Sequence, residues 1–245
     1  MSNAITKQII RQSRLRDLEH FVWEDDFFEG GYARDLALTA ESDPAGSKFG
    51  EVADVSSWLV SLVDGGGDNG ETITIVDDGR LGQLKLLAND ADNDVVHVQL
   101  NGEAFQLAAG KETVIVMRFK VTDVSETDWA IGLAVASTNY LGGVTDGIAL
   151  RCHDSTGDID YVIEKDSVET TADTGVDLAD DTFVTAKFVC DGVSLIRLFI
   201  NDLFIAAGSA NIPDNEALSP FITIRNDGAV AQSIVADILR VAGDR

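Results

Sequence analysis

The apolar residues of this chain recur at every second position from Phe21 onward, and this spacing constrains the fold more than any other feature. In the segment 113–121, every odd position after the first is Ile, Met, Phe or Val, whereas Arg118 and Lys120 fall between them. A period of two is typical of an antiparallel strand with one buried face. The same pattern predicts strands over 21–28, 32–38, 58–63, 71–76, 80–87, 94–100, 104–108, 129–136, 147–152, 159–164, 183–190, 195–200, 203–207, 220–225 and 233–241.

The predicted strands are separated by turns rich in Gly, Asn and Asp. Asp191 and Gly192, for example, form a typical hairpin signal between two apolar segments. Long helical segments are missing between the strands, so crossover connections and a parallel sheet are not expected. Roughly fourteen or fifteen short strands therefore predict an all-β fold with two antiparallel sheets packed as a sandwich. We expect a single sandwich domain over 21–245, preceded by a basic segment over 1–20 in which 4–19 is either a short helix or an arm that orders on contact.

The charge of the chain is unevenly distributed along the sequence. The 245 residues include 18 Lys and Arg against 42 Asp and Glu, for a net charge of −24. Lys7, Arg11, Arg14 and Arg16 occur in the first sixteen residues without an acid, which leaves −28 on the remainder. Such an acidic body is a poor partner for nucleic acid or for an anionic membrane, since both require clustered basic side chains. No apolar stretch is long enough to predict a membrane-spanning helix.

Cysteine usage and the start of the chain bear on where the protein is made. Cys152 and Cys190 are too few for a disulfide framework, and both fall in strand patterns, which predicts buried, small apolar side chains. The first residues lack the apolar core of a secretory signal. We therefore expect folding in a reducing cytoplasm.

The order of strands and turns resembles the concanavalin A-like lectin/glucanase sandwich, a jelly roll shared with laminin-G-like domains. The resemblance extends over about 21–243, and the following segments carry it: 25–31, 129–134, 146–148, 184–207, 220–226 and 237–241. Segment 184–207 is the clearest, because it runs as a strand, an Asp-Gly turn, a strand ending Phe-Ile-Asn-Asp and a short apolar strand. The resemblance implies a two-sheet antiparallel jelly roll.

Sandwiches with an acidic body, an Asp-Asp-Phe-Phe opening and a short N-terminal arm also resemble structural proteins of tailed-phage virions. That resemblance implies a non-enzymatic capsid decoration (cement) protein on the outer face of the head, made in the host cytoplasm. Its implied partners are the major capsid protein and, as a homotrimer, further copies of itself. Contact would come from a sandwich edge and from arm residues Lys7, Ile9, Ile10, Arg11, Arg14, Leu15 and Arg16.

Two alternatives stay open. One is a carbohydrate-binding module of a fibre or cell-surface protein. The other is a glycosidase using Asp158, Asp160 and Glu164, which share one face of a plain strand. The spacing to Glu164 is longer than in the glycosidases of this fold, so the interpretation we favour is a solvated strand face. Trp23, Trp58 and Trp129 are interpreted as core or interface residues rather than sugar platforms.

No cofactor is predicted, although a calcium site is left open. The segment Asp90–Asp94 resembles the start of a calcium loop, but Val95 and Asn101 stand where an EF-hand requires Gly and Glu. A looser Ca²⁺ site built from loop acids is the remaining option, against a simple polar turn. The Gly-rich segment 64–70 lacks the Gly-Lys-Ser/Thr of a phosphate loop and is interpreted as flexible. His20, His97 and His153 lack the spacing of a histidine metal site.

Overall fold

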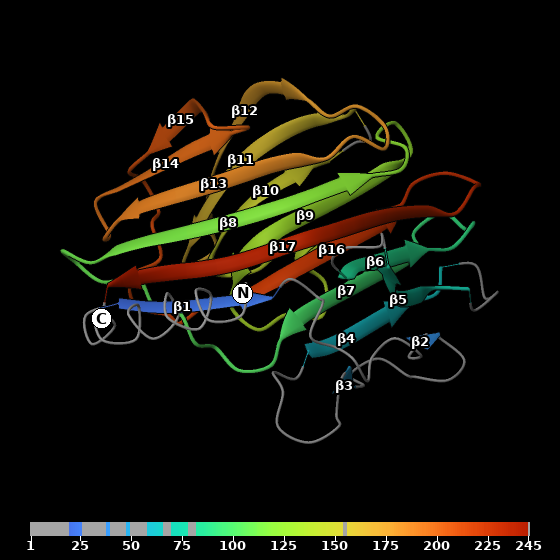
Figure 1. Ribbon diagram of the computed structural model, residues 1–245, viewed down its shortest axis with the longest axis horizontal. Helices are drawn as coiled ribbons and strands as arrows, with labels where there is room; N and C mark the ends of the chain where they lie inside the picture. Colours follow the sequence, from blue (N-terminus) through green and yellow to red (C-terminus); the bar gives the residue numbers. More distant parts are fainter. Residues whose placement is uncertain are drawn as a thin grey trace, which may run out of the picture.

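The computed structural model describes residues 20–25, 38–39, 48–49, 58–65, 70–77, 82–153 and 156–244. Their strands form a nine-stranded and an eight-stranded antiparallel sheet that pack face to face (Figure 1). The all-β sandwich predicted from the alternation is confirmed. Of the predicted N-terminal arm, only His20 lies inside the described residues.

The first sheet, called sheet A here, has β17 near its centre. In spatial order it contains β15 (Leu203–Gly208), β14 (Leu195–Ile200), β13 (Val184–Asp191), β8 (Glu112–Val121), β17 (Gln232–Asp244), β6 (Gly82–Ala88), β5 (Thr72–Asp77) and β2 (Leu38–Thr39). A further strand, β1 (His20–Asp25), pairs with the C-terminal part of β17.

The second sheet, sheet B, lies behind sheet A in Figure 1. Its order is β12 (Val168–Asp177), β11 (Asp158–Lys165), β10 (Gly147–Cys152), β9 (Thr127–Ala134), β16 (Ser219–Asn226), β7 (Val95–Leu100), β4 (Trp58–Val63) and β3 (Lys48–Phe49).

One continuous apolar core lies between the sheets. The alternating residues of β8 point into it, as the sequence predicts, and Phe119 packs against Trp129 of β9 with ring centroids 4.9 Å apart. Trp58, Trp129 and both cysteines are buried, and the cysteines are free thiols. Burying this much apolar side chain supplies the main stabilisation of a sandwich.

The long strand β17 contains a bulge where its register with β8 shifts, between Ala236 and Ile238. The bulge lies beside Asp237, a mostly buried residue that forms an ion pair with Arg118 of β8. The guanidinium of Arg118 also lies 3.9 Å from the ring centroid of Phe183. Bulges of this kind increase strand twist and bend the sheet.

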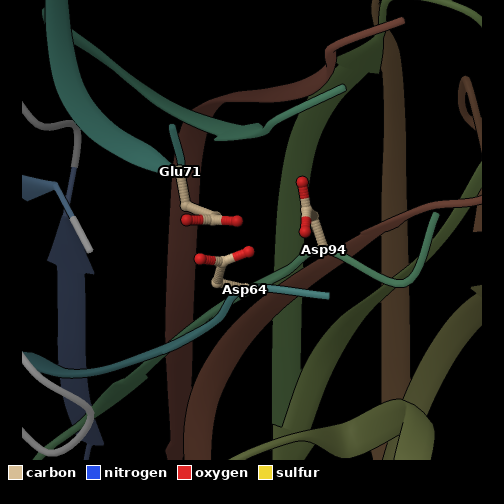
Figure 2. A group of neighbouring side chains, drawn as sticks. All are labelled: Asp64, Glu71 and Asp94. Carbon is tan, nitrogen blue, oxygen red and sulfur yellow. The ribbon is translucent and has the colours of Figure 1, made fainter. Parts of the chain in front are cut away.

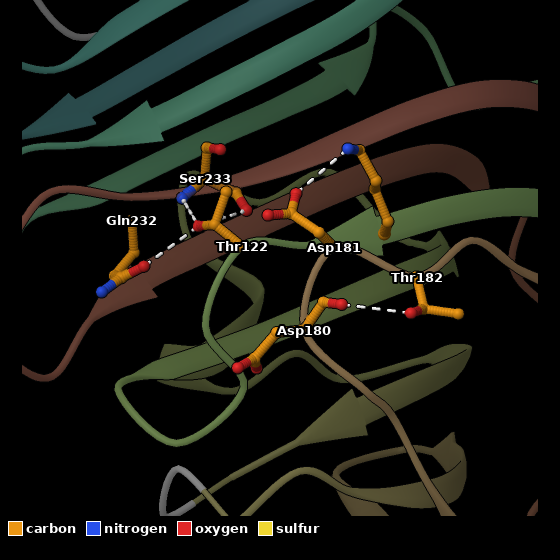
Figure 3. Close-up of polar contacts among 7 residues, drawn as sticks. Thr122, Asp180, Asp181, Thr182, Gln232 and Ser233 are labelled. Carbon is orange, nitrogen blue, oxygen red and sulfur yellow. Dashed lines mark hydrogen bonds and ion pairs between the residues drawn. The ribbon is translucent and has the colours of Figure 1, made fainter.

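Side-chain hydrogen bonds hold the end of β8 against the start of β17 (Figure 3). The Thr122 hydroxyl accepts a hydrogen bond from Ser233 N at 2.8 Å and donates to Gln232 Oε1 at 3.0 Å. Lys120 donates to Asp181 at 3.0 Å on the other side of the strand end. The β8–β9 and β12–β13 connections are thereby fixed at one end of the sandwich.

One predicted strand is absent, one observed strand was not predicted, and one predicted strand lies almost wholly outside the described residues. The segment 104–108 is not a strand, since it contributes only an isolated bridge between Phe105 and Leu218. A strand at Val168–Asp177 was not predicted, because its residues are mostly exposed Thr, Glu and Asp at the sheet edge, without apolar alternation. Of the predicted strand 32–38, only Leu38 lies within the described residues.

Helical structure is nearly absent from the part of the chain that the structure describes, where the one helical segment is a 3₁₀ turn at Tyr140–Gly142. None of the described residues belongs to a helix with the length and apolarity to cross a membrane.

Candidate functional site: one covered face, an exposed edge strand and a carboxylate cluster

The outer face of sheet B is covered at its centre by the chain's own β9–β10 connection, residues 135–146. Because side chains alternate along a strand, Ala130 and Ala149 point away from the core, and Phe221 of β16 does the same. Tyr140 stacks on Phe221 with ring centroids 4.2 Å apart and an interplanar angle of 19°. The small alanines leave room for this ring, and Leu141 and Val144 of the connection pack around the same cluster.

The connection is held in place by Gln99, a fully buried residue of β7. Its side-chain amide donates to the carbonyls of Ala134 and Val135 at 3.1 and 3.0 Å, and its oxygen accepts from Ser137 N at 2.8 Å. Both the nitrogen and the oxygen of this amide therefore hold the loop in position. The centre of this face is occupied by protein, in a place where a flat sheet would otherwise offer a binding surface.

The acids of β11 lie on this same outer face, next to the covered centre. The register pairs Asp158 with Asp177, Asp160 with Asp173 and Glu164 with Glu169, so three like-charged pairs face one another across β11 and β12. Burial, followed by the nearby charges of Asp173 and Asp158, raises the pKa of Asp160. Burial, followed by the nearby charge of Glu169, also raises the pKa of Glu164.

Arg151 of β10 provides a positive charge beside the acids of β11 and β12. Its guanidinium binds both carboxylate oxygens of Glu169, at 2.8 and 2.9 Å, and its charge opposes the raised pKa values of Asp160 and Glu164. The structure thus confirms that the three acids predicted for a glycosidase share a face. The predicted solvated face applies to Asp158 but is wrong for Glu164, which is 9% exposed, and Val162 is buried between Asp160 and Glu164.

A different surface is exposed at the edge of sheet A. Among the described strands, β15 pairs with β14 alone, and all of its side chains are at least partly exposed. Leu203 and Phe204 are 69% and 59% exposed, and Phe204 meets Phe199 edge to face at 5.8 Å. Lys187 lies 4.8 Å from the ring centroid of Phe199. An edge strand with exposed apolar side chains is a surface suited to protein contact.

Three carboxylates form a compact cluster at one end of the sandwich (Figure 2). Asp64 follows β4, Glu71 precedes β5 and Asp94 precedes β7. One carboxylate oxygen from each residue lies within 4.8 Å of the other two. Figure 2 shows Asp64 and Glu71 facing one another, with Asp94 across from them. Strands of both sheets therefore contribute to one acidic group.

Backbone contacts fix Asp94 in this cluster. Its two carboxylate oxygens accept hydrogen bonds from Gly65 N at 2.7 Å and from Ala91 N at 3.1 Å. The close approach needs glycine, because a Cβ on Gly65 would lie 2.5 Å from the carbonyl oxygen of Asp92. A Cβ on Gly70 would likewise collide with the side chain of Asn89. The glycines predicted to be flexible at these two positions thus permit the packing of one turn against another.

Glu71 is the least compensated residue of the cluster. It is fully buried, and neither of its carboxylate oxygens has a hydrogen-bond partner among the described residues. Burial, followed by the charges of Asp94 and Asp64, raises the pKa of Glu71 to about 7. A buried carboxylate without partners is costly, so this group calls for a proton or a cation.

The sequence identified only part of this cluster. Asp94 belongs to the acidic turn in which a calcium site was left open, whereas Asp90 and Asp92 of the same turn are exposed and outside the cluster. Asp64 and Glu71 were missed, since Asp64 begins the segment interpreted as flexible and Glu71 follows it directly. The predicted contact residues of the arm, from Lys7 to Arg16, lie outside the described residues.

The architecture is that of the concanavalin A-like lectin and glucanase jelly roll. A glycoside hydrolase family 16 endo-glucanase from Bacteroides ovatus superposes with a TM-score of 0.57 at 12% identity, over 89% of this chain and 99% of that chain. The carbohydrate recognition domain of Emp46p, in its potassium-bound form, gives 0.52 at 10% identity, over 75% and 87%.

A protein of unknown function from Shewanella oneidensis MR-1, SO2946, is similar over 92% of this chain and 87% of its own, with a TM-score of 0.55 and 14% identity. No protein-family model and no curated protein matches the chain. At these identities the similarity establishes the fold alone, because this fold carries several unrelated functions.

Proposed function

We propose that this protein is a non-enzymatic virion structural protein, a capsid decoration protein that binds the outer face of a phage head. The observation that carries the proposal is the covered centre of sheet B. Tyr140 and its loop occupy the broad face on which a sugar or a catalytic cleft would need space. A sandwich closed in this way is better suited to binding through its edges and termini.

The edge strand β15 is the surface that we assign to the head shell. Leu203 and Phe204 offer exposed apolar area, and among the described residues no strand pairs with the other side of β15. The basic arm, with Lys7, Arg11, Arg14 and Arg16, would add a tether of opposite charge to the acidic body. The rest of the acidic surface would face solvent at the virion surface and avoid nucleic acid.

The test is the occupancy of purified protein on purified phage heads that lack it. Deletion of 1–19 and the double change Leu203→Ser with Phe204→Ser should each reduce occupancy at least about tenfold, the effect of losing ~1.4 kcal/mol of binding. Val230→Ser is the matched control, since Val230 is 67% exposed at a distant loop between β16 and β17. Unchanged occupancy after both the deletion and the edge change would reject the proposal. Light scattering would test the proposed homotrimer.

A carbohydrate-binding module is the second candidate, favoured by the likeness to the carbohydrate recognition domain of Emp46p. A glycan array read with and without Ca²⁺ distinguishes it, because a decoration protein should bind no glycan under either condition. The absence of catalysis is tested separately. If glycan hydrolysis occurs and is lost in Asp160→Asn, the protein is a glycosidase and the non-enzymatic assignment is wrong.

A further inference from the structure

The carboxylate cluster carries an inference that is independent of what the sandwich binds. Asp64 and Asp94 stand at the ends of connections on sheet B, and Glu71 stands at the start of a strand of sheet A. One oxygen from each of the three carboxyl groups lies within 4.8 Å of the other two, so three potential negative charges are close together. Like charges repel at such separations, so folding would not assemble them unless something offset the repulsion.

Glu71 provides the second, independent observation. It has 0% exposed surface and two carboxylate oxygens without a hydrogen-bond partner among the described residues. Buried polar atoms in folded proteins are nearly always paired, and each exception requires an explanation such as a bound ion. Asp94 differs, because backbone N–H groups hold its carboxylate in a fixed orientation.

We propose that Asp64, Glu71 and Asp94 bind one Ca²⁺ ion, which ties the two sheets together at this end of the sandwich. Calcium takes oxygen ligands at about 2.3–2.6 Å, so oxygens on opposite sides of the ion lie roughly 4.6–5.2 Å apart. The three oxygens, all within 4.8 Å of one another, fit inside that sphere. The cluster is built from carboxylates alone, which favours a hard cation over zinc or copper.

The alternative occupant is a proton shared between Glu71 and Asp94. It would neutralise the pair without any metal, and the two cases differ in a measurable way. A bound ion stabilises the folded protein in proportion to its concentration, whereas a shared proton makes the protein indifferent to calcium.

The experiment uses the full chain after treatment with a chelator. Calorimetric titration with CaCl₂ should give a single binding event, and Ca²⁺ at about a hundredfold excess over its Kd should raise Tm by roughly 5–10 °C. Glu71→Gln should abolish both effects while retaining the strand signature in circular dichroism. Asp92→Asn is the matched control, because it also removes one negative charge, from the turn that carries Asp94, while Asp92 itself is exposed and outside the cluster.

The proposal is overturned if neither heat nor a rise in Tm is seen up to ~10 mM Ca²⁺, a concentration above the Kd of extracellular calcium modules. Retention of calcium binding in Glu71→Gln would also overturn it. So would equal losses of binding in Glu71→Gln and Asp92→Asn. Should Glu71→Gln fail to fold, Asp64→Asn replaces it, since Asp64 is partly exposed and its change leaves the buried pair intact. None of these readouts involves phage heads or glycans, so failure here is distinguishable from failure of the proposed function.

Discussion

His97 is a buried histidine on the outer face of β7, 1% exposed and stacked beside Phe221 at 6.0 Å. Its Nδ1 lies 2.5 Å from the Thr223 hydroxyl, and its Nε2 has no partner among the described residues. Burial lowers the pKa of His97 to about 4. The ring is therefore neutral in the folded protein at pH 7.

This histidine makes stability depend on pH in a defined direction. A pKa depressed from 6.5 to about 4 gives stabilisation that is complete above pH 6.5 and is lost as the pH falls toward 4. The loss amounts to about 3 kcal/mol at ~1.4 kcal/mol per pKa unit. Chemical denaturation at several pH values measures it, with His97→Gln as the comparison.

The difference between the two proteins isolates His97 from the carboxyl groups that titrate in the same range. We expect the free-energy difference between wild type and His97→Gln to shrink as the pH falls from 6.5 to 4. A difference that stays constant over that interval would show that the imidazole is not the group responsible.

The residues of the carboxylate cluster show what sequence can and cannot predict at this scale. Asp94 belongs to a run of acids whose spacing drew attention to calcium. Glu71, in contrast, begins a predicted strand after a glycine-rich segment, and nothing in its local sequence indicates that its carboxylate meets other acids. Its role depends on a contact with a turn more than twenty residues later, and that contact is set by strand pairing rather than by local pattern.

At the scale of elements, the β9–β10 connection determines which face of the sandwich is available. Tyr140→Ala should remove a fully packed ring and cost about 3–5 kcal/mol, the usual range for losing a buried aromatic side chain. Amide hydrogen exchange over 135–146 should accelerate, because the loop loses its main apolar contact. Urea denaturation and exchange mass spectrometry measure the two effects.

Tyr140→Phe is the matched control for that change. The Tyr140 hydroxyl is buried without a hydrogen-bond partner among the described residues, so removing it should cost little or add stability. If Tyr140→Ala costs less than ~1 kcal/mol and leaves exchange unchanged, the loop is not a packed cover of the sheet.

Elements with apolar alternation were predictable, and those without it were not. The strand β8 alternates over most of its length and was predicted almost to its ends. The strand β12 consists largely of Thr, Glu and Asp, and it forms because β11 offers a free edge to pair with. The packing of the β9–β10 connection on sheet B was also not predictable, because Tyr140 and Leu141 lie in a segment with turn-forming residues and no repeating pattern.

For the molecule as a whole, the net charge of −24 is a source of instability as well as solubility. Raising NaCl from ~0.01 M to ~0.5 M shortens the Debye length well below the size of the molecule and screens this repulsion. We expect the midpoint of thermal unfolding to rise over that range, measured with a chelator present so that divalent cations contribute nothing. A midpoint that falls with salt would mean that attractive ion pairs, such as Arg151 with Glu169, dominate instead.

The pairing of β1 with β17 also determines how the sandwich responds to force. His20 lies opposite Asp244, and the pairing continues antiparallel to Asp25 opposite Leu239. Tension applied between these two ends therefore acts across the ladder rather than along it, and its hydrogen bonds break one after another. The same sheet pulled along the length of β17 would have to shear its contacts with β8 and β6 together. Mechanical resistance of this protein thus depends on the direction of pull, and it is lower when His20 and Asp244 are pulled apart than when β17 is sheared along its length.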